Sequence, residues 1–280
     1  MKILITGADG QLGKEIQNLF VKDGIEIIPY GKKQLDITNR KEVNAVLNQH
    51  QPNVIINAAA FTKVDLCEVE IEKAYLVNAI GPFNLAVEAK KMDCRFFHIS
   101  TDYVFNGEKN TPYEVDDFTS PNTIYGKSKK LGEELVLAIN EDSTIIRTSW
   151  LYGHKANNFV NTMVNLSNKL DEIKVVDDQI GCPTYTKDLV LILQSLLNEK
   201  PGIYHVTNLG KCSWYEFACE ILQFLNRKSK IIPVTTKEYG AKTPRPMYSV
   251  LSNKKLVDLQ IHQRDWKEAL HEFLRKEYGN

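Results

Sequence analysis

Short apolar segments alternate with longer amphipathic segments along the first half of the chain. Segments of four or five mostly apolar residues predict strands at Lys2–Thr6, Glu26–Pro29, Val54–Asn57, Phe96–Ser100 and Thr144–Thr148. The stretches between them have helical periodicity and predict helices at Gly10–Lys22, Lys41–Gln49, Glu70–Lys90 and Pro121–Ile139. Strands that are apolar on both faces are typical of a parallel sheet covered by helices on each side. The pattern therefore predicts an α/β fold with a doubly wound parallel sheet.

After Gly153 the alternation is less regular. No Pro-, Gly- or Ser-rich linker separates the halves, so we expect residues 151–280 to form mainly a smaller, discontinuous α/β lobe against a sheet domain of residues 1–150, with later strands returning to the sheet. Ser213 and Glu216 have the spacing of a helix capping box. The elements predicted here are strands at Lys174–Val176, Gly202–Thr207 and Lys230–Pro233, and helices at Thr186–Leu197, from Ser213 onward and at Arg264–Tyr278.

The composition is that of an ordinary globular protein. Of 280 residues, 43% are hydrophobic and 25% are charged, and 35 basic residues balance 35 acidic ones. A net charge of zero argues against binding to nucleic acid or to a membrane surface. No apolar run approaches the roughly 20 residues that span a bilayer, and the N-terminal segment lacks the shape of a signal peptide. We therefore expect a cytoplasmic protein that binds neither nucleic acid nor a membrane.

The five cysteines, at positions 67, 94, 182, 212 and 219, form no Cys-x-x-Cys pair and are odd in number. This spacing argues against a disulfide framework and against a thiolate metal site. We expect buried, reduced thiols instead.

A glycine-rich turn, Gly7-Ala-Asp-Gly10-Gln-Leu-Gly13, follows the first predicted strand and opens the first predicted helix. The glycines permit a tight turn, and the amides at the helix start can bind a pyrophosphate. Glycine-rich turns are common, but this one stands at the first strand–helix junction of a βαβ unit, where it is strong evidence for a dinucleotide site. The sequence therefore predicts a Rossmann-type domain that binds a dinucleotide at Gly7, Gly10 and Gly13.

The end of the second predicted strand bears on the choice between NADH and NADPH. An acidic residue there accepts a hydrogen bond from the ribose 2′-hydroxyl of NADH. This segment reads Pro29-Tyr30-Gly31-Lys32-Lys33, with no acid and two lysines. Because the lysines would attract a 2′-phosphate, we favour NADPH and expect NADH to be tolerated. The alternative is that both lysines lie on a solvated loop.

Two further segments lie close to the predicted cofactor site. Asp36 can accept from the adenine amine while Ile37 covers the ring, or Asp36 can cap the next helix. The small side chains at Ala58, Ala59 and Ala60 either let a cofactor approach the sheet edge or allow close helix–sheet packing.

Tyr125 and Lys129 lie one helical turn apart on the same helix face. A nearby ammonium lowers the pKa of a phenol from its usual value near ~10, so Tyr125 can donate or accept a proton near neutral pH. Such pairs are common on helix surfaces, but beside a dinucleotide fingerprint they indicate nicotinamide-dependent carbonyl chemistry. Thr101 follows the strand Phe96–Ser100, at the sheet edge where open α/β sheets bind ligands.

With these residues assembled, the chain resembles the dTDP-4-dehydrorhamnose reductases, a family of extended short-chain dehydrogenase/reductases. The resemblance extends over essentially the whole chain. Its motifs are GADGQLG (7–13), NAAAFTKVD (57–65), STDYVFNG (100–107), YGKSK (125–129), RTSWLYG (147–153), NNFV (157–160), DDQIGCPT (177–184) and TPRPMYSVL (243–251).

The resemblance implies reduction of the C4 keto group of dTDP-4-dehydro-L-rhamnose by NADPH or NADH. It implies that Tyr125 is the proton donor, that Lys129 assists it and binds the nicotinamide ribose, and that Thr101 hydrogen-bonds the carbonyl oxygen. Asp102 and Trp150 would contact the sugar. The cofactor contacts that we expect are Gly7, Gly10, Gln11, Leu12, Gly13, Tyr30, Lys32, Asp36, Ile37, Ala58, Ala60, Phe61, Thr62, Tyr125 and Lys129.

Two expected substrate contacts also have ordinary structural readings. Trp150 can be a core residue or an apolar wall for the deoxysugar, and the resemblance favours the wall. Arg245 lies between Pro244 and Pro246, which stiffen the backbone. A guanidinium held in this way suits a bidentate contact with a diphosphate, and the alternative is a solvated loop arginine.

Some members of the family bind a metal at a dimer contact through acidic side chains. Glu15 lies in the corresponding helix, but Lys187 stands where a second acid is expected. We therefore expect no metal, and either a monomer or a homodimer.

Two other readings of the fold compete with the reductase. In a nucleotide-sugar dehydratase an added acid pair accompanies the active-site threonine, but here Asp102 is followed by Tyr103. An epimerase on the same scaffold would retain its NAD through purification. A non-catalytic regulatory subunit, such as the partner of methionine adenosyltransferase, would be favoured by loss of Tyr125 or Lys129, and both are present.

Overall fold

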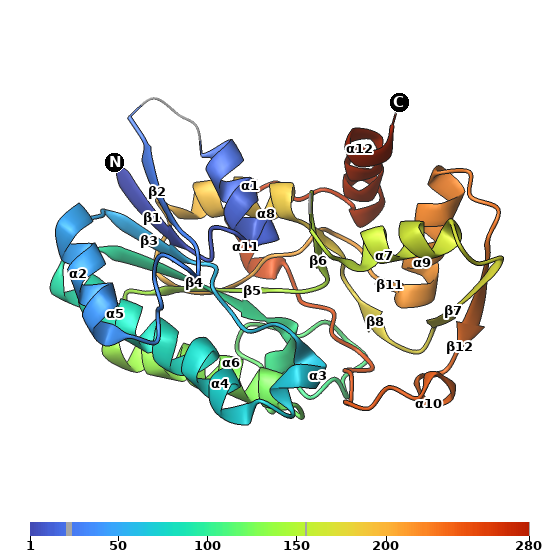
Figure 1. Ribbon diagram of the computed structural model, residues 1–280, viewed down its shortest axis with the longest axis horizontal. Coiled ribbons are helices and arrows are strands. Elements are labelled where there is room, and N and C mark those ends of the chain that lie inside the picture. The colour runs from blue at the N-terminus through green and yellow to red at the C-terminus, as the bar shows by residue number, and fades with distance from the viewer. Residues whose placement is uncertain (21–23, 155, 280) are drawn as a thin grey trace.

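The computed structural model describes residues 1–20, 24–154 and 156–279. Six parallel strands form a central sheet in the order β10-β5-β4-β3-β1-β2 (Figure 1). All six lie within two residues of the predicted bounds, which confirms the doubly wound sheet. The strands are β1 (Lys2–Thr6), β2 (Glu26–Tyr30), β3 (Val54–Asn57), β4 (Arg95–Thr101), β5 (Thr144–Thr148) and β10 (Gly202–His205).

Helices cover both faces of the sheet (Figure 1). Ile3 and Ile5 of β1 pack with α1, α8 and α11 in one buried cluster, whereas Leu4 packs with α2, α5 and α6 in another. This alternation follows from the two-residue repeat of a strand. The predicted end of the first helix, Lys22, lies outside the described residues. The helices are α1 (Gln11–Leu19), α8 (Thr186–Leu196), α11 (Lys254–Asp258), α2 (Arg40–His50), α5 (Gly81–Lys91) and α6 (Ile124–Ile139).

The helical segment predicted over Glu70–Lys90 is present, but it is not one regular α-helix. The chain instead forms α4 (Ile71–Tyr75), a π-helical turn over Leu76–Ile80 and then α5. Pro82, near the start of α5, has no N–H to donate to the carbonyl of Asn78 four residues earlier. The helical hydrogen-bond ladder is therefore interrupted at this point, where a π turn is accommodated.

The π turn positions the loop that follows β3. The Asn78 side chain accepts from the backbone N–H of Phe61 at 2.7 Å and donates to the Phe61 carbonyl at 3.1 Å. Its amide also donates to the hydroxyl of Ser128 on α6 at 3.0 Å. Gly132 allows α6 to approach, because a Cβ there would overlap the Asn78 carbonyl oxygen. Residues 58–62 are thereby tied to α6, which carries Tyr125.

The remaining elements form a smaller lobe beside the carboxyl ends of the strands (Figure 1). Its core is a buried cluster rich in aromatic side chains, among them Tyr152, Tyr185, Phe217 and Phe273. The capping box at Ser213 and Glu216 is present. The lobe contains β6 (Leu151–Tyr152), α7 (Phe159–Ser167), β7 (Glu172–Val176), β8 (Ile180–Gly181), β9 (Thr184–Tyr185), β11 (Cys212–Ser213), α9 (Trp214–Phe224), β12 (Lys230–Val234), α10 (Thr236–Tyr239) and α12 (Trp266–Tyr278).

Within the described residues, every helix is too short or too polar to cross a membrane. All five cysteines are free thiols, and only Cys219 is partly exposed.

Candidate active site

A cleft of about 480 Å³ lies at the carboxyl edge of the sheet. Because β2 and β3 flank β1 on opposite sides, the loops after β1 and β3 separate and leave a crevice, as in other open α/β sheets. Trp214, at the start of α9, closes the cleft from the smaller lobe. The predicted site residues that line it are Gly10, Gln11, Leu12, Gly13, Ala58, Ala60, Thr62, Thr101, Asp102, Tyr125, Lys129 and Trp150.

Several predicted cofactor residues lie outside this lining. The hydroxyl of Tyr30 is 2.8 Å from Nε2 of His50, and Lys32 is exposed in the following turn. Asp36 accepts from the backbone N–H and the hydroxyl of Thr38, at 2.9 and 2.8 Å. It therefore orders its own turn, and α2 is capped by Asn39 instead.

Three further predicted residues support the cleft from behind. Ile37 is buried in the sheet core, against Gly81 of α5. Phe61 packs in the small cluster around Tyr125. Gly7 has a φ of +69°, and a Cβ there would lie 2.6 Å from the backbone of Ala58. Only glycine suits this position, because both the backbone conformation and the close approach exclude a side chain.

The glycine-rich turn suits a pyrophosphate. Gly10 precedes α1 and has no side chain to cap it, so the first helix amides lack partners within the helix. These amides and the positive end of the helix dipole favour an anion in the cleft. Gln11 Oε1 is buried and has no hydrogen-bond partner among the described residues, while its Nε2 donates to the Leu151 carbonyl at 3.1 Å. The residues present therefore fit a dinucleotide cofactor.

Tyr125 stands in the first turn of α6, which Thr123 caps by accepting from the N–H of Gly126 at 3.0 Å. Burial raises the pKa of the Tyr125 phenol, and a hydrogen bond with Thr101 only partly opposes this effect. The sequence predicted that Lys129 lowers this pKa. In the structure burial dominates instead, and the Lys129 Nζ is directed to the carbonyl of Ile99.

Lys129 is almost completely buried, at 1% exposure. Its Nζ donates to the carbonyl of Ile99 at 2.6 Å and lies 3.3 Å from Nε2 of His98. Burial lowers the pKa of Lys129 to about 8, and the nearby Glu133 carboxylate opposes the shift. The charge of Lys129 is therefore sensitive to its immediate neighbours.

Thr101 and Asp102 form a hydrogen-bonded pair at the end of β4. The Thr101 hydroxyl donates to Asp102 Oδ1 at 2.9 Å and accepts from the N–H of Tyr103 at 3.2 Å. Burial raises the pKa of Asp102 to about 6, against the effect of hydrogen bonds from Ser249 and Thr101. Asp102 is thus a buried carboxylate that is ionised at neutral pH at a cost to stability.

We predict that Asp102→Asn stabilises the protein at high pH. The pKa of Asp102 in the folded protein, about 6, lies above the ordinary value of 3.8. The destabilisation that comes from ionising this buried carboxyl group is therefore complete above pH 6 and disappears as the pH falls toward 4. At pH 8 the substitution should raise the free energy of unfolding by about 1–3 kcal/mol, with a much smaller gain at pH 4. Urea denaturation at both pH values measures this difference, with the exposed Asp258→Asn as control. Equal destabilisation at both pH values would contradict the prediction.

Trp150 lies on the wall of the cleft rather than in the core. It has a φ of +47°, and its indole stacks on Trp214 with centroids 3.5 Å apart and planes 8° from parallel. A side chain at Gly181 would overlap this indole. The sequence did not reveal the role of Trp214, because its only local signal was the capping box at Ser213.

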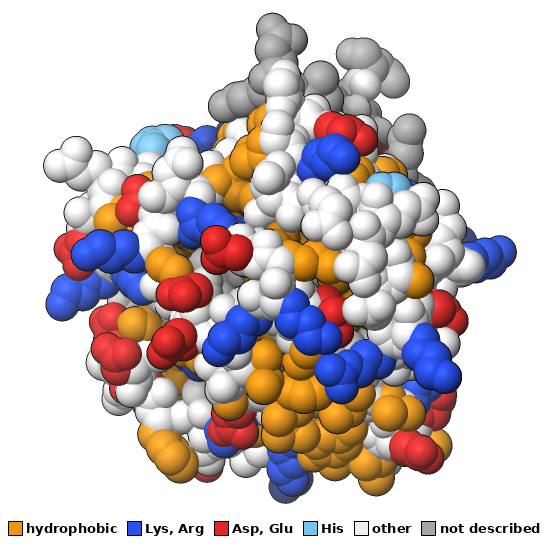
Figure 2. Space-filling view, turned by 90° about the vertical axis from the view of Figure 1, so that its left-hand side faces the viewer, with side chains coloured by type: hydrophobic (Ala, Val, Ile, Leu, Met, Phe, Trp, Pro, Cys, Tyr) orange, Lys and Arg blue, Asp and Glu red, His pale blue; other side chains and the backbone are white. Residues whose placement is uncertain are grey.

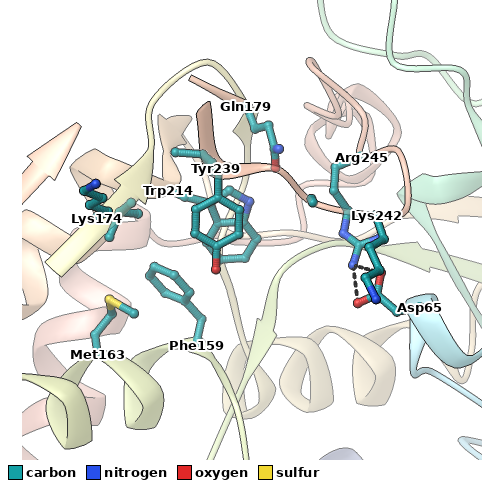
Figure 3. Close-up of a pocket in the computed structure, with 12 residues that line it drawn as sticks. Asp65, Phe159, Met163, Lys174, Gln179, Trp214, Tyr239, Lys242 and Arg245 are labelled. Carbon is teal, nitrogen blue, oxygen red and sulfur yellow. Dashed lines mark hydrogen bonds and ion pairs between the residues drawn. The ribbon is translucent and has the colours of Figure 1, made fainter. Parts of the chain in front are cut away.

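A second cavity of about 480 Å³ adjoins the first at Trp214, which lines both (Figure 3). Phe159, Trp214 and Tyr239 surround it, and Lys242 and Arg245 lie together at one end. The Arg245 guanidinium contacts both carboxylate oxygens of Asp65 at 2.9 Å. The cavity thus combines aromatic surfaces with a cationic end. Apart from Arg245, its residues were not predicted as site residues, because they come from five separate segments of the chain.

The helix face that carries Glu15 does not suit a metal ion. Lys187 and Lys276 both contact Glu272 at 2.6 Å, and both ammonium groups also act on Glu15. Within the described ranges, no group of three or more His, Cys, Asp or Glu side chains could hold a metal. Ammonium groups therefore balance the carboxylates at this place.

The sheet, the glycine-rich turn and the Tyr125–Lys129 pair define a short-chain dehydrogenase/reductase. The chain matches the family model described as the RmlD substrate binding domain over residues 1–278, and it belongs to that family. It is 50% identical over 275 residues to the spore coat polysaccharide biosynthesis protein SpsK of Bacillus subtilis, covering 98% of this chain and 97% of that one.

Two solved structures are similar over almost their whole length. A dTDP-4-dehydrorhamnose reductase from Clostridium acetobutylicum is 47% identical, with a TM-score of 0.96 and 99% of each chain covered. A dTDP-4-dehydrorhamnose reductase from Bacillus anthracis in complex with NADP is 42% identical, with a TM-score of 0.94, covering 98% of this chain and 99% of that one. The resemblance inferred from the sequence motifs is thereby confirmed.

Proposed function

We propose that this protein uses NADPH to reduce the C4 keto group of dTDP-4-dehydro-L-rhamnose, giving dTDP-L-rhamnose. The observation that carries the proposal is a single cleft that joins an uncapped glycine-rich helix start to Thr101, Tyr125 and Lys129. The similar reductases from Clostridium acetobutylicum and Bacillus anthracis, the second in complex with NADP, support this substrate and cofactor.

Tyr125 has the properties of the proton donor. Residues Gly10–Gly13 would hold NADPH, which would supply the hydride for the sugar carbon. Because burial raises its pKa, the Tyr125 phenol stays protonated at neutral pH and can give its proton to the carbonyl oxygen. The hydroxyl of Thr101 is hydrogen-bonded to Tyr125. By turning its proton from Asp102 to the substrate, it would stabilise the charge that develops on the carbonyl oxygen.

The second cavity suits the nucleotide part of the substrate. Its aromatic side chains can stack on a thymine base, and Arg245 and Lys242 can bind the diphosphate. The Trp150–Trp214 stack, between the two cavities, offers an apolar surface to the deoxysugar. The substrate would thus lie across both cavities, with its sugar directed toward Tyr125.

A turnover experiment tests the proposal. Purified protein is mixed with NADPH and dTDP-4-dehydro-L-rhamnose, nicotinamide absorbance is followed, and the product is identified by NMR. We expect stoichiometric NADPH consumption and dTDP-L-rhamnose, with slower turnover of the control dTDP-4-keto-6-deoxy-D-glucose. No NADPH consumption, or NAD retained through purification, would favour the regulatory or epimerase alternatives.

We predict that Lys32 and Lys33 give a modest preference for NADPH. Both are exposed, in the turn after β2, so each contributes only about 0–1 kcal/mol to binding of a 2′-phosphate. Replacing both by alanine should raise the KM for NADPH several-fold, with little change for NADH, and salt should reduce the difference. Steady-state kinetics with both cofactors measures this effect, with Lys90→Ala/Lys91→Ala on α5 as control. If both KM values moved together, the lysines would have no role in selectivity.

A further inference from the structure

A pair of stacked tryptophans stands between the two cavities. Trp150 lines only the cleft at the sheet edge, whereas Trp214 lines both that cleft and the second cavity. In Figure 3, Trp214 lies with Phe159 and Tyr239 on one side of the second cavity, and Arg245 lies on the other. The indole of Trp214 is therefore a side chain that any ligand occupying both cavities must meet.

The stack covers one face of Trp150. The two indole centroids are 3.5 Å apart and the ring planes are 8° from parallel. This separation is van der Waals contact between carbon atoms, so no other group fits between the rings. It also places the rings almost directly face to face, an arrangement that aromatic pairs favour less than an offset or edge-to-face one. The stack is thus tight, but its geometry is not the most stable one for two indoles.

Trp150 is the fixed member of the pair. Its φ of +47° lies in the left-handed region, which costs energy in a residue other than glycine and so has to be maintained by the surroundings. Its carbonyl accepts from the N–H of Thr184 at 3.2 Å, and a Cβ at Gly181 would overlap its indole. The hydroxyl of the preceding Ser149 donates to the Cys182 carbonyl at 2.7 Å. The segment from β8 to β9 therefore holds Trp150 in place.

Trp214 has a fixed backbone but a side chain with space beside it. The capping box of Ser213 and Glu216 holds the start of α9, and the Ser213 hydroxyl also donates to Asp177 Oδ1 at 2.6 Å. Outside the stack, the indole packs on Phe159, with centroids 4.5 Å apart, and borders the second cavity of about 480 Å³. The indole can therefore turn into this cavity while α9 stays in place.

We propose that Trp214 is a positioning residue, which covers Trp150 in the free protein and is displaced from it by the sugar of the bound substrate. This inference rests on the proposed function, because a nucleotide sugar with its base in the second cavity and its C4 at Tyr125 has to extend past the stack. The methyl group and ring C–H groups of a 6-deoxysugar are apolar surface that can replace an indole on the face of Trp150. The nucleotide alone lacks this surface, so dTDP leaves the stack in place. Trp214 thus makes the cleft respond to the sugar rather than to its carrier.

Fluorine-19 NMR tests the proposal, because the chain has only three tryptophans. Protein labelled with 5-fluorotryptophan is saturated with NADP⁺, and the resonances of Trp150, Trp214 and Trp266 are assigned with single phenylalanine variants. Adding dTDP-L-rhamnose should move the Trp150 resonance, because its stacked neighbour leaves, whereas dTDP should leave this resonance where it is. Trp266 is buried in the core of the smaller lobe and is the internal control.

Binding measurements give a second readout. Trp214→Leu should weaken binding of dTDP, since the second cavity loses an aromatic side chain, but the sugar then has no indole to displace. The ratio of the Kd of dTDP to that of dTDP-L-rhamnose, measured by calorimetry, should therefore rise by about 2–10-fold, the equivalent of one aromatic pair. Tyr239→Leu is the matched control: Tyr239 also lines the second cavity but lies outside the stack, so its loss should leave this ratio unchanged.

Trp214→Phe covers the case in which Trp214→Leu does not fold, and its smaller ring should give an intermediate ratio. A Trp150 resonance that stays in place when dTDP-L-rhamnose is bound, or that moves equally with dTDP, would overturn the proposal. An unchanged Kd ratio in the Trp214 variants would do the same. If dTDP-L-rhamnose does not bind at all, the proposed function fails together with the inference. If it binds and moves the Trp150 resonance but no sugar is reduced, only the proposed function fails.

Discussion

Replacing Tyr125 by phenylalanine should reduce kcat by about 10²–10⁴-fold, the usual contribution of a positioned general acid. The substitution removes the proton donor and keeps the ring, which packs edge-to-face on Tyr103 with centroids 5.4 Å apart. Cofactor binding should hardly change, because Gly10–Gly13 and Lys129 are untouched. Steady-state kinetics with dTDP-4-dehydro-L-rhamnose, together with NADPH titration by fluorescence, separates the two effects.

Tyr103→Phe is the matched control for this experiment. Tyr103 lines the same cleft, and burial raises the pKa of its phenol as well. Among the described residues, the Tyr103 hydroxyl makes no hydrogen bond with Thr101. Removing this hydroxyl should therefore have only a small effect on kcat. Near-normal turnover of Tyr125→Phe, or an equal loss in both variants, would rule out Tyr125 as the specific acid.

The elements that form the cofactor end of the site were predictable because their signals are local. Each strand of the sheet is a short apolar run, and the turn over residues 7–13 carries its glycines at fixed spacing. Tyr125 and Lys129 are one helical turn apart on α6, so their common face follows from sequence alone. The parallel topology then brings Thr101, at the end of β4, to the same edge as the glycine-rich turn.

The electrostatics of the site were not predictable, since they depend on contacts between distant segments. Sequence spacing suggested that Lys129 acts on Tyr125, but the ammonium is directed to Ile99 and His98 on β4. The position of the loop after β3 likewise depends on a distant contact, with Asn78 in the π turn. No local pattern reports such contacts.

The second cavity shows the same limit. Trp214 follows a helix cap, Phe159 begins α7 and Tyr239 ends α10, and each is an ordinary aromatic position on its own. They meet only because the smaller lobe packs α7 and α9 together beside β7. Arg245 was found because two prolines flank it, but its ion pair with Asp65, on a helix 180 positions earlier in the chain, was not apparent from the sequence.

Arg245→Met should raise the KM for the dTDP-sugar by about 10–100-fold with a smaller effect on kcat, because a charged hydrogen bond to a diphosphate contributes about 1.5–3 kcal/mol. Asp65→Asn removes the same ion pair but keeps the guanidinium. The pair is partly exposed, with Asp65 at 63% side-chain exposure, so its loss alone should change stability by less than about 1 kcal/mol. Initial rates over a range of substrate concentrations, with thermal melts of both variants, distinguish the two roles. If Arg245 only held the loop to Asp65, both variants would raise the KM for the dTDP-sugar equally. If Arg245 binds the diphosphate, Asp65→Asn should leave this KM unchanged or lower it, because no carboxylate then competes for the guanidinium.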